Sequence, residues 1–127
     1  MNYAHRYAQA AAGTASRERL MVMLFDKALL DIRSGAAALE DGRSIEGRRA
    51  LNHALDIVTE LHATLDATRA PALGDLLGQV YQFVSLRLGE ACLRGDARLA
   101  REAERAFTPI AHGFSQAALL VAGAEAP

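Results

Sequence analysis

The chain has 127 residues, of which 51% are apolar and 23% are charged, and its formal net charge is −1. This composition is typical of one globular domain and argues against disorder. Because charges of both signs are interspersed, no basic face is expected, and neither nucleic acid nor an anionic membrane surface is an expected partner. The abundance of alanine and the scarcity of proline favour helix throughout.

Residues 1–13 form a short segment that carries Tyr3 and Tyr7 four residues apart. A tyrosine presents a large apolar ring with a polar tip. We therefore interpret this segment as an N-terminal cap that folds back over an apolar surface until a partner arrives. The competing interpretation is a loosely ordered tail.

The first helix is expected to follow Thr14-Ala15-Ser16, which can cap it, and to end at Asp41-Gly42, where glycine permits a left-handed turn. Its apolar residues recur at spacings of three and four, the pattern of a helix with one buried face. Gly35 falls in the same series and would permit close packing. The series consists of Met21, Phe25, Ala28, Ile32 and Leu39.

Ser44 is the expected cap of a second helix, which should end near residues 67–70. Pro71 suits the first turn of a third helix, because its missing N–H has no helical partner there. Gly95-Asp96 separates the third helix from the fourth. The second series is Leu51, Ala54, Val58, Leu61 and Leu65. The third is Leu73, Leu77, Val80, Val84, Leu88 and Ala91.

The fourth helix contains a series that includes Leu99, Ala103, Phe107, Ile110 and Phe114. Pro109 lies inside this helix, removes the hydrogen bond to the Arg105 carbonyl and is expected to kink it. Helices of roughly 20 to 25 residues with short connections predict an antiparallel up-down-up-down four-helix bundle. The bundle should span residues 14–122 and leave a frayed tail at 123–127.

The sequence contains no constellation that indicates catalysis, a metal or another cofactor. Glu60-Leu61-His62 lacks the Glu-x-x-His spacing of a di-metal bundle, and the single cysteine, Cys92, excludes a cysteine-based zinc site. Cys92 is expected to be a half-buried apolar residue. Phosphotransfer through His53 or His62 stays open as a minor alternative. The remaining carboxylates, among them Asp26, Asp31 and Asp66, are expected on a solvated face.

The helices carry more apolar residues than one core stripe requires. A globular helix usually needs an apolar arc of a little over 100°. The surplus indicates a groove that binds apolar helices of another polypeptide; the alternatives are edge packing against more than one neighbouring helix and a self-associating face of a homodimer. The surplus residues are Leu20, Val22, Met23, Leu24, Leu29, Leu55, Ile57, Leu76, Tyr81 and Phe83. The candidate groove contacts are Leu20, Met23, Leu24, Leu55, Tyr81 and Leu88.

No apolar run approaches the roughly 18 residues of a membrane span, so direct membrane insertion is not expected. The N-terminus lacks the basic-then-apolar order of a signal peptide. Together these features predict a cytoplasmic protein, in the cytosol.

The ordered set of motifs resembles the FliS family, the flagellin-specific export chaperones of bacteria. After the tyrosine segment come Thr14-Ala15-Ser16, Leu20 and M-L-F-D-K-A-L at residues 23–29. The later matches are Ala54, Ile57-Val58, Glu60-Leu61, Thr64-Leu65-Asp66, Tyr81, Phe83-Val84, Arg87-Leu88, Ala91, Asp96, Leu99 and Glu102. The chain departs from the family pattern at Arg17, Cys92 and Phe114, where proline, asparagine and tryptophan are usual, and in the 67–71 turn and at Pro109.

The resemblance implies a non-enzymatic four-helix bundle that binds the disordered C-terminal region of flagellin in the cytosol. It further implies that binding prevents premature polymerisation and that the complex is delivered to a component of the flagellar type III export gate. The segment around Tyr3 and Tyr7 would cover part of the groove when it is empty. The expected state is a monomer or weak dimer, and the alternative is a homodimeric structural or regulatory bundle without a flagellin client.

Overall fold

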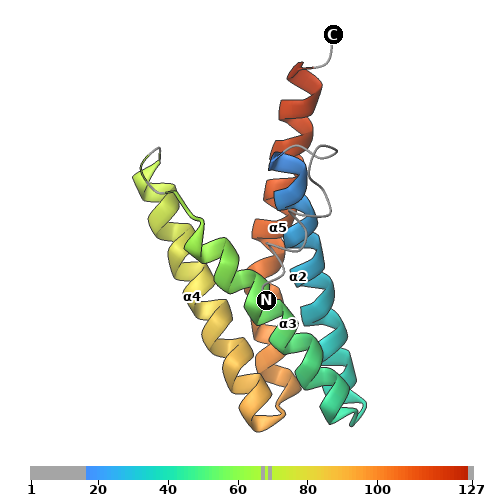
Figure 1. Ribbon diagram of the computed structural model, residues 1–127. Helices are drawn as coiled ribbons and strands as arrows, with labels where there is room; N and C mark the ends of the chain where they lie inside the picture. Colours follow the sequence, from blue (N-terminus) through green and yellow to red (C-terminus); the bar gives the residue numbers. More distant parts are fainter. Residues whose placement is uncertain (1–16, 67, 69, 126–127) are drawn as a thin grey trace.

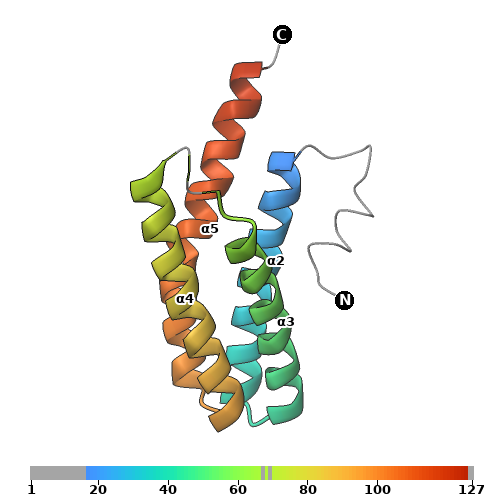
Figure 2. The ribbon, with the colours of Figure 1, turned by 60° about the vertical axis from the view of Figure 1, so that its left-hand side comes forward.

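The computed structural model describes residues 17–66, 68 and 70–125, with side chains as far as residue 117. This part of the chain forms four helices and no strand: α2 (Arg17–Glu40), α3 (Ser44–Ala63), α4 (Pro71–Arg94) and α5 (Ala97–Glu125). Successive helices run in opposite directions (Figures 1 and 2) and pack in a closed ring, α2 on α3, α3 on α4, α4 on α5 and α5 on α2. The fold is therefore the all-α four-helix bundle that the sequence predicts.

The helix ends follow the local sequence closely. Gly42 and Gly95 adopt left-handed φ angles of +79° and +64°, as glycine allows at the end of a helix. Pro71 occupies the first turn of α4. Ser44 is not the cap that we expected, because it is the first helical residue and Arg43 holds the cap position without a side-chain cap hydrogen bond. Helix α5 continues through Pro109 to Glu125, three residues past the expected end of the bundle.

Most residues of the predicted apolar series form the core. Phe25, Val58, Val84 and Phe107 are each at most 2% exposed, and the rings of Phe25 and Phe107 stack with centroids 5.7 Å apart. Much of the surplus is core as well, because each helix packs against two neighbours and therefore buries a wider arc. Surplus residues that are buried in this way are Leu24, Leu29, Ile57 and Tyr81.

The end of the bundle at which α2 runs into α3 is tightly closed. Gly35 and Gly47 bring the backbones of α2 and α3 together: a Cβ atom at Gly35 would lie 2.6 Å from Leu51 Cδ2. Nearby, the Arg101 guanidinium bridges α5 to α2 through two hydrogen bonds to Glu40, at 2.7 and 3.0 Å. Glu104 extends this network, accepting bonds from both Arg101 and Arg33 at 2.9 Å.

Asp31 differs from the solvated carboxylate that we expected. It is only 5% exposed, and one of its oxygens pairs with Lys27 Nζ at 2.9 Å. The other oxygen, Oδ2, is buried and accepts no hydrogen bond from any residue that the structure describes. The charge is tolerated in this position because Lys27 stands one helical turn away on the same face.

Candidate partner-binding groove

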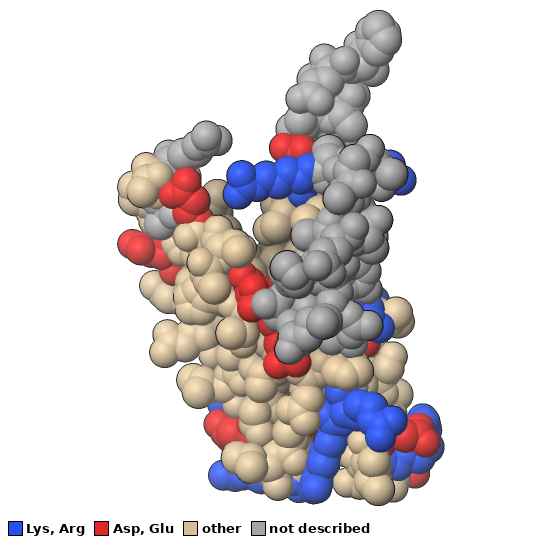
Figure 3. Space-filling view, in the orientation of Figure 1, with Lys and Arg blue, Asp and Glu red and all other residues tan. Residues whose placement is uncertain are grey.

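The helices diverge at the end of the bundle opposite the Gly35–Gly47 crossing. Figure 1 shows the α3–α4 pair leaning away from α2 and α5 at this end, and the surface is hollowed between the two pairs (Figure 3). A cavity of about 640 Å³ opens there, with walls from all four helices and the loop after α3. Its lining includes Met21, Phe25, Leu61, Leu65, Leu73, Leu76, Leu77, Tyr81, Pro109, Ile110 and Phe114.

The early end of α3 accounts for this opening. The Thr64 hydroxyl donates to the Glu60 carbonyl at 3.0 Å, and Asp66 Oδ1 accepts bonds from the backbone N–H and hydroxyl of Thr68. Such side-chain bonds to the local backbone favour turns over helix. Because α3 stops at Ala63, the first turns of α4 lack part of their packing, and Leu73 and Leu76 are 54% and 57% exposed.

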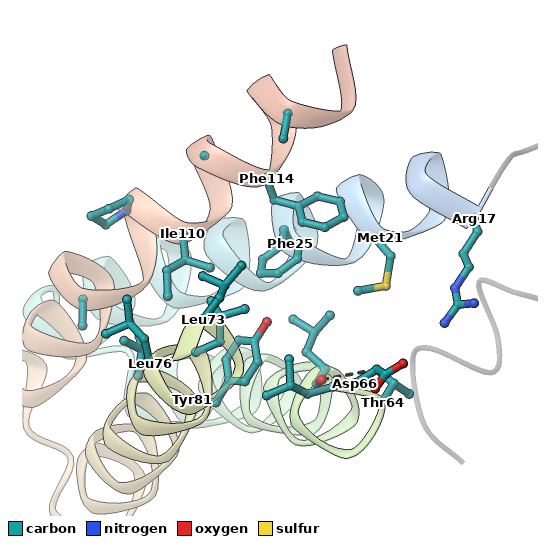
Figure 4. A pocket seen from close by; sticks show the side chains of 18 residues that line it. Arg17, Met21, Phe25, Thr64, Asp66, Leu73, Leu76, Tyr81, Ile110 and Phe114 are labelled. Atoms are coloured by element: carbon teal, nitrogen blue, oxygen red, sulfur yellow. Dashed lines mark hydrogen bonds between the residues drawn. The ribbon is translucent and has the colours of Figure 1, made fainter. Parts of the chain in front are cut away.

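A second cavity of about 400 Å³ continues the first along α2 and α3. Met21, Leu61 and Phe114 line both cavities, so the two form one continuous depression, which we call the groove. Leu20 and Leu24 form the apolar wall of the second cavity, while Glu18 and Glu60 contribute carboxylates. Arg17 lines both cavities from the start of α2, and Figure 4 shows its side chain at the edge of the first.

The six candidate groove residues separate into three groups. Leu20, Leu24 and Tyr81 line the groove. Met23, at 38% exposed, and the half-buried Leu55 lie outside both cavities. Leu88 is fully buried in the core and lines neither cavity, so its packing stabilises the fold. Contact of these residues with a partner stays a prediction, and the cap residues Tyr3 and Tyr7 lie outside the described residues.

Sequence reasoning missed several groove residues for an identifiable reason. Leu73, Leu77, Ile110 and Phe114 line the groove but belong to the periodic series that we assigned to the core. Periodicity shows which face of a helix is apolar; it does not show where neighbouring helices diverge. Pro109 also lines the groove, where a proline ring adds apolar surface without a backbone donor.

A line of exposed apolar residues continues from the groove along the outer face of α4. It comprises Leu76, Phe83, Leu86 and Leu93, which are 39% to 85% exposed. The Arg87 guanidinium lies over the Phe83 ring, 4.7 Å from its centroid, and its Nε is 2.9 Å from Glu102 Oε2 on α5. Over α3 and α4, the face in Figure 3 is largely uncharged, with acidic side chains scattered across it.

The chemistry of the site is that of an apolar binding surface. Burial raises the pKa of Tyr81 to about 12, so its phenol is neutral near pH 7. Burial also raises the pKa of Cys92, a half-buried residue as predicted, which disfavours the reactive thiolate. No group of residues suited to a metal ion occurs in the described part of the chain. None of the helices, as far as they are described, is long and apolar enough to span a bilayer.

An open apolar groove in a helical bundle is a common docking site for amphipathic helices of other polypeptides, and the chain has the features of this class. The chain belongs to the FliS family: residues 1–120 match the family described as "Flagellar protein FliS".

Three relatives agree with this assignment. The flagellar secretion chaperone FliS of Salmonella typhimurium is 31% identical over 115 residues, covering 90% of this chain and 85% of that protein. The protein of the same name from Bacillus subtilis is 30% identical over 111 residues, with coverages of 87% and 82%. That from Escherichia coli is 27% identical over 118 residues, with coverages of 92% and 87%. The family and these names support a flagellar export chaperone and point to a non-enzymatic role.

Proposed function

We propose that this protein binds the disordered C-terminal region of flagellin in the cytosol. Binding prevents premature polymerisation and delivers flagellin to a component of the flagellar type III export gate. The observation that carries this proposal is the continuous apolar groove at the open end of the bundle, found in a chain that belongs to the FliS family.

The shape of the groove fits an apolar helix better than a small molecule. Its walls come from four helices, and its two cavities share Met21, Leu61 and Phe114 in their linings. Amphipathic helices commonly dock into such grooves by their apolar faces. The exposed leucines along α4 extend the apolar surface beyond the groove, so a longer segment could wrap around the bundle.

The proposed interaction couples folding of the flagellin segment to its binding. A disordered segment loses conformational entropy when it becomes helical, so its affinity must come from a large buried apolar surface. A chaperone for export benefits from this arrangement, because the client stays unfolded when it is released.

The test is a titration of the purified chain with a peptide spanning the C-terminal region of flagellin from the same organism. We expect one peptide per chain, a negative heat-capacity change and a gain of helical circular dichroism. Absence of binding heat at several temperatures, together with an unchanged spectrum, would rule the proposal out.

A homodimeric bundle without a client is the alternative from another class. It predicts a tight dimer in sedimentation of the isolated chain, with the apolar surface covered by the second copy. The chaperone proposal predicts a monomer or weak dimer that forms a complex with the peptide.

A further inference from the structure

Tyr81 places a polar atom in the middle of the apolar groove. The residue is 2% exposed, and Figure 4 shows its hydroxyl directed into the cavity, toward the space between Leu73 on α4 and Phe25 on α2. The described residues provide no hydrogen bond to this hydroxyl, and desolvation is the only cause that raises its pKa. On its far side the ring contacts His62, with centroids 5.7 Å apart.

The hydroxyl faces the open groove, where water can bond it in the free protein. A bound helix would displace that water, and the phenol would then lose its hydrogen bonds unless the ligand supplied an acceptor. Buried tyrosines usually have a hydrogen-bond partner. Phenylalanine would fill the same space and make the same contact with His62, so packing alone does not account for a tyrosine at this position.

We propose that the Tyr81 hydroxyl anchors the bound segment by donating a hydrogen bond to a neutral carbonyl oxygen on its apolar face. The inference rests on the proposed function and names the chemistry that the groove selects. A protonated phenol donates well to an oxygen acceptor. A carboxylate in this place would be desolvated among leucine and phenylalanine side chains, whereas an amide or backbone carbonyl enters at lower cost.

The ligand is therefore an amphipathic helix whose apolar face contains one uncharged polar group. That group is either a side-chain amide or a backbone carbonyl freed at a helix end. A helix of the same shape with only apolar groups at this point would leave the phenol unpaired. A site built around a buried hydrogen bond discriminates against such a ligand.

The variant Tyr81→Phe separates binding from folding. We expect the melting temperature of the free chain to be unchanged or raised, because no described residue bonds the deleted hydroxyl. Affinity for the flagellin peptide should fall about 5- to 50-fold, because its carbonyl is then left unpaired in an apolar site. The matched control is Ser34→Ala, which removes a hydroxyl bonded to the Leu30 carbonyl outside the groove and should leave peptide affinity unchanged.

A double-mutant cycle would identify the acceptor. Each uncharged polar residue of the peptide is replaced in turn with leucine, and binding is measured to the unmodified chain and to Tyr81→Phe. At the position of the acceptor, the replacement should weaken binding to the unmodified chain but not to Tyr81→Phe. If no single position behaves so, the acceptor is a backbone carbonyl and the affinity loss in Tyr81→Phe persists for every peptide.

Two results would overturn the anchor: equal peptide affinity for the two proteins, or a lower melting temperature of free Tyr81→Phe, which would mean that the hydroxyl serves the fold. Both leave the proposed function intact. Failure of the unmodified chain to bind the peptide would instead remove the proposed function and the anchor together.

Discussion

Gly35 and Gly47 face each other where α2 and α3 cross, and neither position has room for a side-chain carbon. A Cβ atom at Gly35 would lie 3.1 Å from the Gly47 carbonyl oxygen, and one at Gly47 would lie 3.0 Å from that of Gly35. This contact holds one end of the bundle closed while the other end, where α3 stops early, stays open.

Gly35→Ala should destabilise the protein. The added methyl group overlaps Leu51, and overpacking of this kind costs about 1–3 kcal/mol, which the better helix propensity of alanine offsets by about 1 kcal/mol. We expect the free energy of unfolding in urea to fall by up to about 2 kcal/mol. Gly89→Ala is the matched control: it meets nothing within 4 Å and should be neutral or stabilising. Equal effects of the two substitutions would contradict the packing argument.

The Glu40–Arg101–Glu104–Arg33 network should make stability sensitive to acid. Burial raises the pKa of Glu104, but the hydrogen bonds from Arg101 and Arg33 outweigh it, so the pKa lies below its ordinary value of 4.5. The Arg101 hydrogen bond likewise lowers the pKa of Glu40. A lowered folded-state pKa gives stability that is present above pH about 4.5 and is lost as the pH falls through the folded-state value.

Glu104→Gln should therefore be less stable than the unmodified chain at pH 7, with a difference that shrinks below pH about 4.5. Urea unfolding across this pH range measures the effect. The control is Glu46→Gln, whose ion pair with Arg43 is exposed on both sides and should contribute little at any pH. A difference for Glu104→Gln that stays constant with pH would mean that the ionised carboxylate is not what stabilises the network.

Leu76→Asp should weaken binding of the flagellin peptide without unfolding the protein. Leu76 lines the groove at 57% exposed, so an aspartate there is solvated in the free chain but must be desolvated beneath a bound helix. We expect at least a tenfold loss of affinity by titration calorimetry. Ile45→Asp tests the specificity of this effect, because Ile45 is 76% exposed and lies at the closed end of the bundle. Similar losses for both would point to a general effect of charge.

Deletion of residues 1–13 should raise the association rate of the peptide if the segment with Tyr3 and Tyr7 covers the groove. Stopped-flow mixing measures this rate. The dissociation rate of the complex should change less, because in the complex the peptide has already displaced the segment from the groove. The double variant Tyr3→Ala, Tyr7→Ala should reproduce most of the effect at full length. An unchanged or slower association rate would remove the cap hypothesis.

Much of the fold could be read from the sequence, because helices and their ends depend on local chemistry. Apolar residues spaced by three and four, in series that include Phe25, Val58 and Phe107, identified the buried faces of the helices. Gly42, Pro71 and Gly95 marked helix ends through their backbone preferences. The ordered motifs also indicated the family, which the family match confirms. These signals lie within one turn of a helix or within a short stretch of chain.

Only the tertiary structure decided which apolar residues are core and which line the groove. Leu88 and Leu73 belong to one periodic series, yet Leu88 is fully buried and Leu73 is 54% exposed, since the neighbouring helix ends before it reaches Leu73. Asp31 is buried although its charge predicted a solvated face. Burial depends on the positions of other helices, so a periodic pattern identifies an apolar face but not what covers it.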